Sequence, residues 1–220
     1  MRVATTIATV DTPPGLHAQD RADVYALLAR LLFGADAAAL AALPHAPPWP
    51  GTAGAAAAWE SLQHAAARCN ATAAAEFGAL FVAAGTPPLN PHECYYVAGC
   101  LMDKPLALLR RDLQALGLAR PEGVTELEDH LGALCEAMRV LVERGRPLEQ
   151  QGDFFRKHLA GWAGACLHDI RSAPAADFYA ALADFIEAFF ATEAALFGIE
   201  PVAAPHEPTA YQWRTGALQP

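Results

Sequence analysis

The feature that most constrains the fold is a series of alanine- and leucine-rich segments whose apolar residues recur at helical spacing. Alanine and leucine are strong helix formers, and the alternating runs of β-branched residues that are typical of strands are nearly absent. Two proline-rich stretches, at residues 44–51 and 85–91, interrupt the helical pattern. The sequence therefore predicts an all-α, single-domain helical bundle with two proline-rich loops.

The predicted bundle occupies residues 20–198, between an N-terminal lead-in at 1–19 and a C-terminal tail at 199–220. The lead-in contains Pro13-Pro14-Gly15, and the tail contains three prolines and no helical stripe. A chain of 220 residues that is 54% hydrophobic can bury a sizeable core. We expect the first helix to follow Asp20 and a long helical region to span residues 52–84, with a break near 70–72. Further helices are expected over residues 104–116, 125–144, 148–171 and 174–197.

Charge and cysteine usage exclude several classes of function. The net charge is -9, and the basic residues form no stripe of the kind that tracks a phosphate backbone, so we expect no nucleic-acid partner. The five scattered cysteines do not resemble a disulfide framework, which favours a reducing, cytoplasmic compartment. We expect neither a secretory signal nor a membrane span, because the apolar runs are short or interrupted.

The most unusual polar cluster is the segment 125–131, Thr-Glu-Leu-Glu-Asp-His-Leu. Thr125 and Glu128 have the spacing of a capping box, which predicts that a helix begins here. Capping does not explain Asp129 and His130. One explanation is structural: an internal ion pair, or a hydrogen-bonded histidine at the start of the helix. The alternative is a binding site that also includes Glu126, which lies one helical turn before His130.

The sequence gives weaker support to two other hypotheses, a zinc site and a metal-dependent enzyme. His92, Cys94 and Cys100 are ligand-type residues, but a tetrahedral zinc site needs a fourth ligand. His168-Asp169 is the dipeptide of HD-type metal-dependent phosphohydrolases, with His130 and Asp184 as further candidate ligands. A lone dipeptide near a helix end has the simpler explanation of favourable helix-terminal charges, so we expect no enzyme activity, no metal and no cofactor.

Three segments, in this order and spacing, resemble the TorD-like family of redox-enzyme maturation chaperones, which includes the DmsD and NarJ branches. They are 76–81 with Pro87-Pro88 and Tyr95-Tyr96, 126–130, and 154–162 followed by 177–179. The second resembles the family's E-P-x-D-H motif, with Leu127 in place of the proline. The sequence at 91–94, Pro-His-Glu-Cys, departs from the usual Pro-Tyr form of the loop.

The resemblance implies a chaperone that binds the twin-arginine signal peptide of a molybdenum or tungsten oxidoreductase precursor until its cofactor is inserted. Carboxylates beside an apolar groove suit such a leader, which combines arginines with an apolar segment. The implied peptide-binding residues are Asp129 and His130 with Glu126 in support, and a facing wall of Pro87, Pro88, Tyr95 and Tyr96. If His130 became charged it would repel arginine, so binding is expected to weaken as the pH falls through its pKa.

Three finer expectations accompany the resemblance. Residues 87–91 and 99–106 are most similar to members associated with formate dehydrogenases. Some relatives exchange helices between subunits, and the connection at 144–147 would permit a homodimer of that kind. The structural alternative is a helical adaptor without leader recognition, in which Asp129 and His130 could be replaced without changing what the protein binds.

Overall fold

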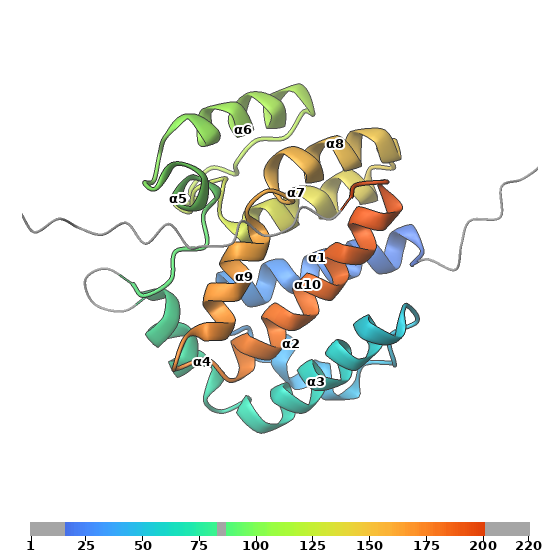
Figure 1. Ribbon diagram of the computed structural model, residues 1–220, viewed down its shortest axis with the longest axis vertical. Coiled ribbons are helices and arrows are strands. Elements are labelled where there is room, and N and C mark those ends of the chain that lie inside the picture. Colours follow the sequence, from blue (N-terminus) through green and yellow to red (C-terminus); the bar gives the residue numbers. More distant parts are fainter. Residues whose placement is uncertain (1–15, 83–86, 201–220) are drawn as a thin grey trace, which may run out of the picture.

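The computed structural model describes residues 16–82 and 87–200, and within these ranges every regular element is helical (Figure 1). The predicted all-α class and single helical body are confirmed. The predicted lead-in and tail lie almost entirely outside the described residues. The helices are α1 (Ala18–Phe33), α2 (Ala37–Ala42), η1 (Leu43–His45), α3 (Ala53–Cys69), α4 (Ala73–Phe77), the π-helical η2 (Gly78–Val82), α5 (Glu93–Ala98), α6 (Lys104–Ala115), α7 (Leu131–Glu143), α8 (Leu148–His158), α9 (Ala163–Ser172) and α10 (Phe178–Leu196).

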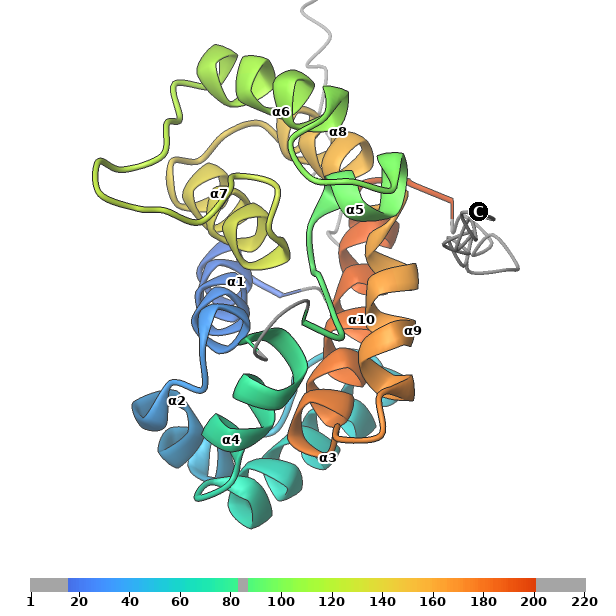
Figure 2. The ribbon, with the colours of Figure 1, turned by 90° about the vertical axis from the view of Figure 1, so that its left-hand side faces the viewer.

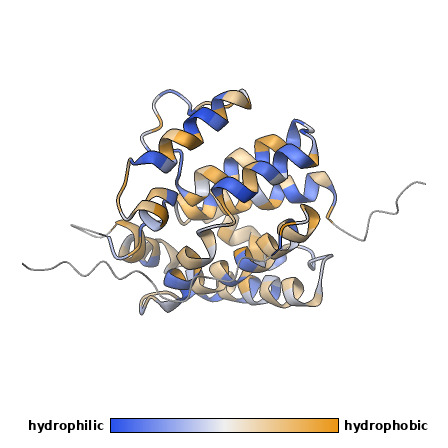
Figure 3. Cartoon of the chain, turned by 45° about the horizontal axis from the view of Figure 1, so that its top comes forward, coloured by the Kyte–Doolittle hydropathy of each residue, from blue (hydrophilic) through white to orange (hydrophobic). Residues whose placement is uncertain are grey.

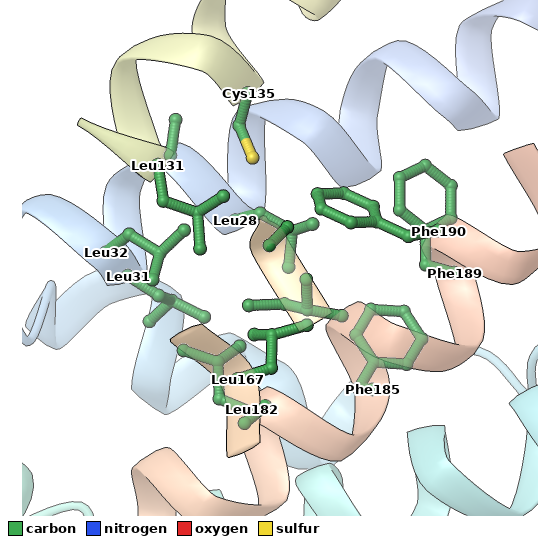
Figure 4. Packing of buried hydrophobic residues seen from close by; sticks show 14 of the residues in the cluster. Leu28, Leu31, Leu32, Leu131, Cys135, Leu167, Leu182, Phe185, Phe189 and Phe190 are labelled. Atoms are coloured by element: carbon green, nitrogen blue, oxygen red, sulfur yellow. The ribbon is translucent and has the colours of Figure 1, made fainter. Parts of the chain in front are cut away.

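The body is organised around two helix pairs that share one core. Helix α1 packs along α7, and α10 packs against both α3 and α9 (Figure 2). Apolar side chains from α1, α7, α9 and α10 point toward one another between these pairs (Figure 4). The labelled members of this cluster are Leu28, Leu31, Leu32, Leu131, Cys135, Leu167, Leu182, Phe185, Phe189 and Phe190. Burying these large side chains is the main stabilising contribution to the fold.

Several of the helices carry hydrophilic as well as hydrophobic residues along their length (Figure 3). In the part of the chain that the structure describes, no helix has the length and apolarity needed to cross a bilayer. The apolar face of α7 is turned into the core, since Leu131, Leu134, Met138 and Leu141 are all fully buried.

One polar network is buried between α1, α8 and α10. The guanidinium of Arg21 donates to both carboxylate oxygens of Glu193 at 2.7 Å and to Gln151 Oε1 at 2.9 Å. The hydroxyl of Tyr25 donates to the same carboxylate at 2.9 Å. The network ties three helices together, and each of its charges has a partner.

Glu76 connects two of the sequence segments that resemble the TorD-like family. Its carboxylate accepts hydrogen bonds from the backbone amides of Asp177 and Tyr179 at 2.8 Å and of Phe178 at 3.1 Å. These amides belong to the start of α10, which has no other side-chain cap. A side chain from α4 therefore caps a helix that lies about a hundred residues further along the chain.

Four predicted boundaries were wrong, and one of them is the start of α7, which lies at Leu131 rather than at residue 125. Helix α1 begins at Ala18 rather than after Asp20. The predicted helix over 148–171 is two helices, α8 and α9, separated by a turn at 159–162 in which the Trp162 indole donates to the His158 carbonyl at 2.7 Å. Helix α10 begins at Phe178, where the amides are capped by Glu76, rather than at Pro174. The break predicted near 70–72 is confirmed between α3 and α4.

Candidate functional site

Two segments far apart in the sequence meet to form the site. Residues His92 and His130 pair in an isolated antiparallel bridge. The Glu93 amide donates to the Asp129 carbonyl at 2.9 Å, and the Leu131 amide donates to the Pro91 carbonyl at 2.8 Å. This pairing holds the end of the second proline-rich loop against the start of α7.

The capping box predicted at Thr125 and Glu128 was wrong. Helix α7 begins at Leu131, and its N-cap is His130, whose Nδ1 accepts from the Gly132 amide at 3.0 Å. Thr125 is exposed and lies in the irregular segment before the helix. Glu128 instead accepts from Arg110 at 2.8 Å. The tertiary pairing with residues 91–93 keeps this backbone out of the helix and so outweighs the local capping signal.

A cavity of about 360 Å³ opens beside this bridge. Most of its surface is apolar, and its polar groups are confined to one edge near the bridge. Such an arrangement is typical of ligand sites, in which apolar walls supply affinity and a few polar groups set orientation. The cavity is lined by Leu32, Phe33, Phe77, Phe81, Val82, Pro87, Leu89, Asn90, Pro91, His92, Leu101, Glu126 and His130.

Glu126 is ionised at this edge. His92 Nε2 lies 3.0 Å from Glu126 Oε1, and the Leu127 amide donates to the same oxygen at 3.1 Å. The hydrogen bond from His92, which is the largest influence, lowers the pKa of the Glu126 carboxyl to about 2. The other ring nitrogen of His92 hydrogen-bonds to Asn90 Oδ1, so the imidazole is fixed from both sides.

His130 is neutral. It is only 6% exposed, its ring stacks on Phe33 with centroids 5.1 Å apart, and the ring of His92 lies edge-on at 5.0 Å. Burial, reinforced by the neighbouring imidazole of His92, lowers the pKa of His130 to about 4. Because Nδ1 accepts the capping hydrogen bond, the neutral ring carries its proton on Nε2.

Asp129 lies beneath the cavity rather than in it. It is fully buried, and its Oδ2 accepts from the Cys94 amide at 3.0 Å. Its Oδ1 has no hydrogen-bond partner among the described residues. In this structure Asp129 holds the start of α5 against the bridge and has no access to a ligand.

The predicted facing wall is only partly present. Pro87 lines the cavity, but Pro88, Tyr95 and Tyr96 do not. Tyr96 stacks on Trp162 with centroids 5.6 Å apart and donates to Asp169 at 3.0 Å, whereas Tyr95 is 45% exposed.

Phe77, Phe81 and Val82 form part of the apolar lining of the cavity. Phe77 and Phe81 are also in ring contact with each other, with centroids 5.2 Å apart. Both belong to the segment 76–81 that carries the family resemblance, and that shared segment was the one signal that could have placed them here. Phe33 and Leu101 had no such signal.

The candidate ligands of the two metal hypotheses do not gather into one metal site within the described residues. Cys94 is buried and Cys100 is exposed. Asp169 accepts from Tyr96, and Asp184 accepts from Arg171 at 3.2 Å. Among the residues with described positions, no group of three or more His, Cys, Asp or Glu side chains is arranged to hold a metal ion.

A protein-family model described as nitrate reductase delta subunit matches residues 50–168, which is more than half of the chain. The matched region includes the η2 segment, the second proline-rich loop and both residues of the His92–His130 bridge. A search of curated proteins found no match. The chain belongs to the nitrate reductase delta subunit family, the NarJ/TorD-like group of non-catalytic redox-enzyme maturation chaperones.

Proposed function

We propose that this chaperone binds the twin-arginine signal peptide of a molybdenum or tungsten oxidoreductase precursor in the cavity beside the His92–His130 bridge. Chaperones of this family bind precursors of molybdoenzyme catalytic subunits. The observation that carries the proposal is an apolar cavity with an ionised carboxylate, Glu126, at one edge. A leader offers the complementary pair of features, a cationic end and an apolar run.

Glu126 places a negative carboxylate at the edge, where His92 is its neighbour at 3.0 Å. Glu126 is ionised over the whole physiological range, because its pKa is about 2. His130 is neutral over the same range, because its pKa is about 4, and therefore adds no charge that would repel an arginine. The expected loss of binding through protonation of His130 thus moves down to pH values near 4.

The other predicted site residues take different parts in this proposal. Asp129 and Tyr96 support the cavity by holding α5 against the bridge and against α9. Pro88 and Tyr95 are exposed and lie outside the cavity lining, so they would contact only the part of a leader that extends beyond it.

We propose a formate dehydrogenase as the first client to test and the cytoplasm as the place of binding. The similarity of residues 87–91 and 99–106 to formate-dehydrogenase-associated members supports this client. Residues 87, 89–91 and 101 line the cavity, so differences in this part of the sequence would change which leader fits.

Two exposed valines provide a matched test. Val82 is 63% exposed and lines the cavity, whereas Val97 is 59% exposed and does not. Val82→Glu should weaken binding of a fluorescently labelled twin-arginine peptide about tenfold, because it places a charge against the apolar run. Val97→Glu should bind within about twofold of the unmodified protein.

Both variants alter exposed positions, so circular dichroism and thermal unfolding should match the unmodified protein. Equal affinities for the peptide in the two variants, with both folded, would contradict the proposed location of the site. Absence of any peptide binding to the unmodified protein would contradict the function itself.

A further inference from the structure

The carboxylates of segment 126–130 differ in what they can still bind. Glu128 is occupied by two arginines, since Arg110 Nη2 lies 2.8 Å and Arg120 Nε 3.6 Å from its oxygens, and its side chain is only 12% exposed. Asp129 is fully buried. Neither carboxylate lines the cavity.

Glu126 is the one carboxylate, among the described residues, that lines the cavity, and only half of it is engaged. Its Oε1 accepts from His92 and from the Leu127 amide. Its Oε2 accepts no hydrogen bond from a described residue, and the side chain is 42% exposed. Arg120 is close by but donates to the Glu126 backbone carbonyl at 3.1 Å rather than to the carboxylate.

A second polar group at the same edge is also without a partner. His130 lines the cavity, is 6% exposed and uses only Nδ1 within the described structure. The Nε2–H of the neutral ring is therefore a donor available to the cavity. A peptide carbonyl of a bound leader would accept a hydrogen bond from this N–H.

We infer that the cavity binds a single cationic side chain of the leader, through Glu126 Oε2, and a neighbouring peptide carbonyl, through His130 Nε2. This inference rests on the proposed function. Because His92 holds Oε1, a guanidinium can bind Glu126 through one oxygen rather than in a bidentate pair. The second arginine finds no open carboxylate there, because Glu128 is already paired with Arg110 and Arg120. His92, which departs from the usual sequence of this loop, is a positioning residue for Glu126.

Citrulline is a neutral near-isostere of arginine and allows the bound charges to be counted. The probe is a synthetic peptide with two adjacent arginines followed by a run of leucine and alanine, together with the version in which both arginines are citrulline. Replacing both should weaken binding to the unmodified protein only about fivefold, the value of one partly exposed ion pair. The Glu126→Gln variant should bind the arginine and the citrulline peptides equally, because the whole difference in affinity comes from the ion pair with the Glu126 carboxylate.

Glu122→Gln is the matched control, since Glu122 is an exposed carboxylate of the same loop that does not line the cavity. The Glu122→Gln variant should keep the fivefold difference in affinity between the arginine and the citrulline peptides. A loss of about 25-fold, the product of two such pairs, would overturn the inference, as would a loss that persists in Glu126→Gln. In either case the peptide still binds and the proposed function stands, whereas failure of both peptides to bind would overturn both.

Discussion

At His130, the same ring performs a structural and a potential binding role because its two nitrogens face different environments. Nδ1 caps α7 through the Gly132 amide, and Nε2 lies at the cavity edge. Burial against Phe33 removes the charge that would conflict with a cationic ligand. The burial of this histidine should therefore be visible in the pH dependence of stability.

The pKa of His130 is about 4 in the folded protein, below its ordinary value near 6.5, so the unfolded chain takes up a proton first as the pH falls. Stability should decrease between about pH 6.5 and 4, by about 2 kcal/mol at pH 5 from this group. The contribution of Glu126 changes in a lower range, between the ordinary pKa of a glutamate near 4.5 and its folded value of about 2, and is nearly constant between pH 7.5 and 5.

Urea unfolding at pH 7.5 and pH 5 measures the effect. His130→Asn retains a side-chain acceptor for the cap but does not titrate, so it should lose about 2 kcal/mol less between the two pH values than the unmodified protein. The other titrating groups are common to both proteins. An identical pH dependence in the two would contradict the assigned pKa.

The sequence singled out Asp129 and His130 as residues that the expected capping box does not explain, with Glu126 in support, but it could not rank their accessibility. It also did not predict that His130 is itself the N-cap of α7. Asp129 is buried because it accepts from the Cys94 amide, which lies 35 residues earlier. Glu128 is occupied by Arg110, which lies 18 residues earlier. Contacts between residues so far apart depend on the fold and leave no local pattern.

Among the helices, α10 depends on a cap supplied by α4. Three backbone amides at its start donate to the Glu76 carboxylate. This contact explains why the segments 76–81 and 177–179 occur together: one supplies the cap, and the other supplies the amides. The same contact sets the position of Phe77 and Phe81 in the cavity wall.

Glu76→Ala should lower the free energy of unfolding by about 2–3 kcal/mol, because it leaves three amides without their charged partner. Glu76→Gln keeps an acceptor and should lose about half as much. Urea unfolding at neutral pH gives both values. Glu60→Ala, at an exposed position of α3, should stay within about 0.5 kcal/mol of the unmodified protein. A Glu76→Ala variant as stable as Glu60→Ala would contradict the capping role.

Helical periodicity predicted the existence of most helices but not all of their ends. The start of α7 was misplaced because the bridge to residues 91–93 competes with the local capping box. The division between α8 and α9 was missed because Phe155, Leu159, Trp162 and Cys166 keep helical spacing across it and are all buried. A continuous apolar stripe therefore does not require a continuous helix.

Across the whole molecule, the buried Arg21–Glu193 pair links the N-terminal helix to the last one. Arg21→Met should lower the free energy of unfolding by about 3–5 kcal/mol, because Glu193 would remain buried without its cation. Adding Glu193→Gln should recover part of that loss, since the remaining group is uncharged. Urea unfolding of the single and double variants tests this, and a double variant less stable than Arg21→Met would contradict it.

The sequence was sufficient to predict the all-helical class, the single body and the family. The helical spacing of alanine and leucine indicates the first two, and the order of the three motifs indicates the family. The cavity could not be predicted from the sequence, because its lining comes from α1, α4, η2, the second proline-rich loop and the start of α7 together. Helix exchange through residues 144–147 stays a prediction. In the single chain this connection is a tight turn, with Gly145 at φ 60° and the Arg146 amide bonded to the Leu141 carbonyl at 3.0 Å.

The central claim is that the cavity beside the His92–His130 bridge holds the leader of an oxidoreductase precursor. The most direct measurement is affinity capture from the native host with the tagged unmodified protein, Val82→Glu and Val97→Glu, followed by mass spectrometry of the co-purifying N-termini. The unmodified protein and Val97→Glu should recover a molybdenum or tungsten oxidoreductase precursor with its twin-arginine leader intact, and Val82→Glu should recover much less. Equal recovery by Val82→Glu, or recovery only of processed enzyme without its leader, would contradict the claim.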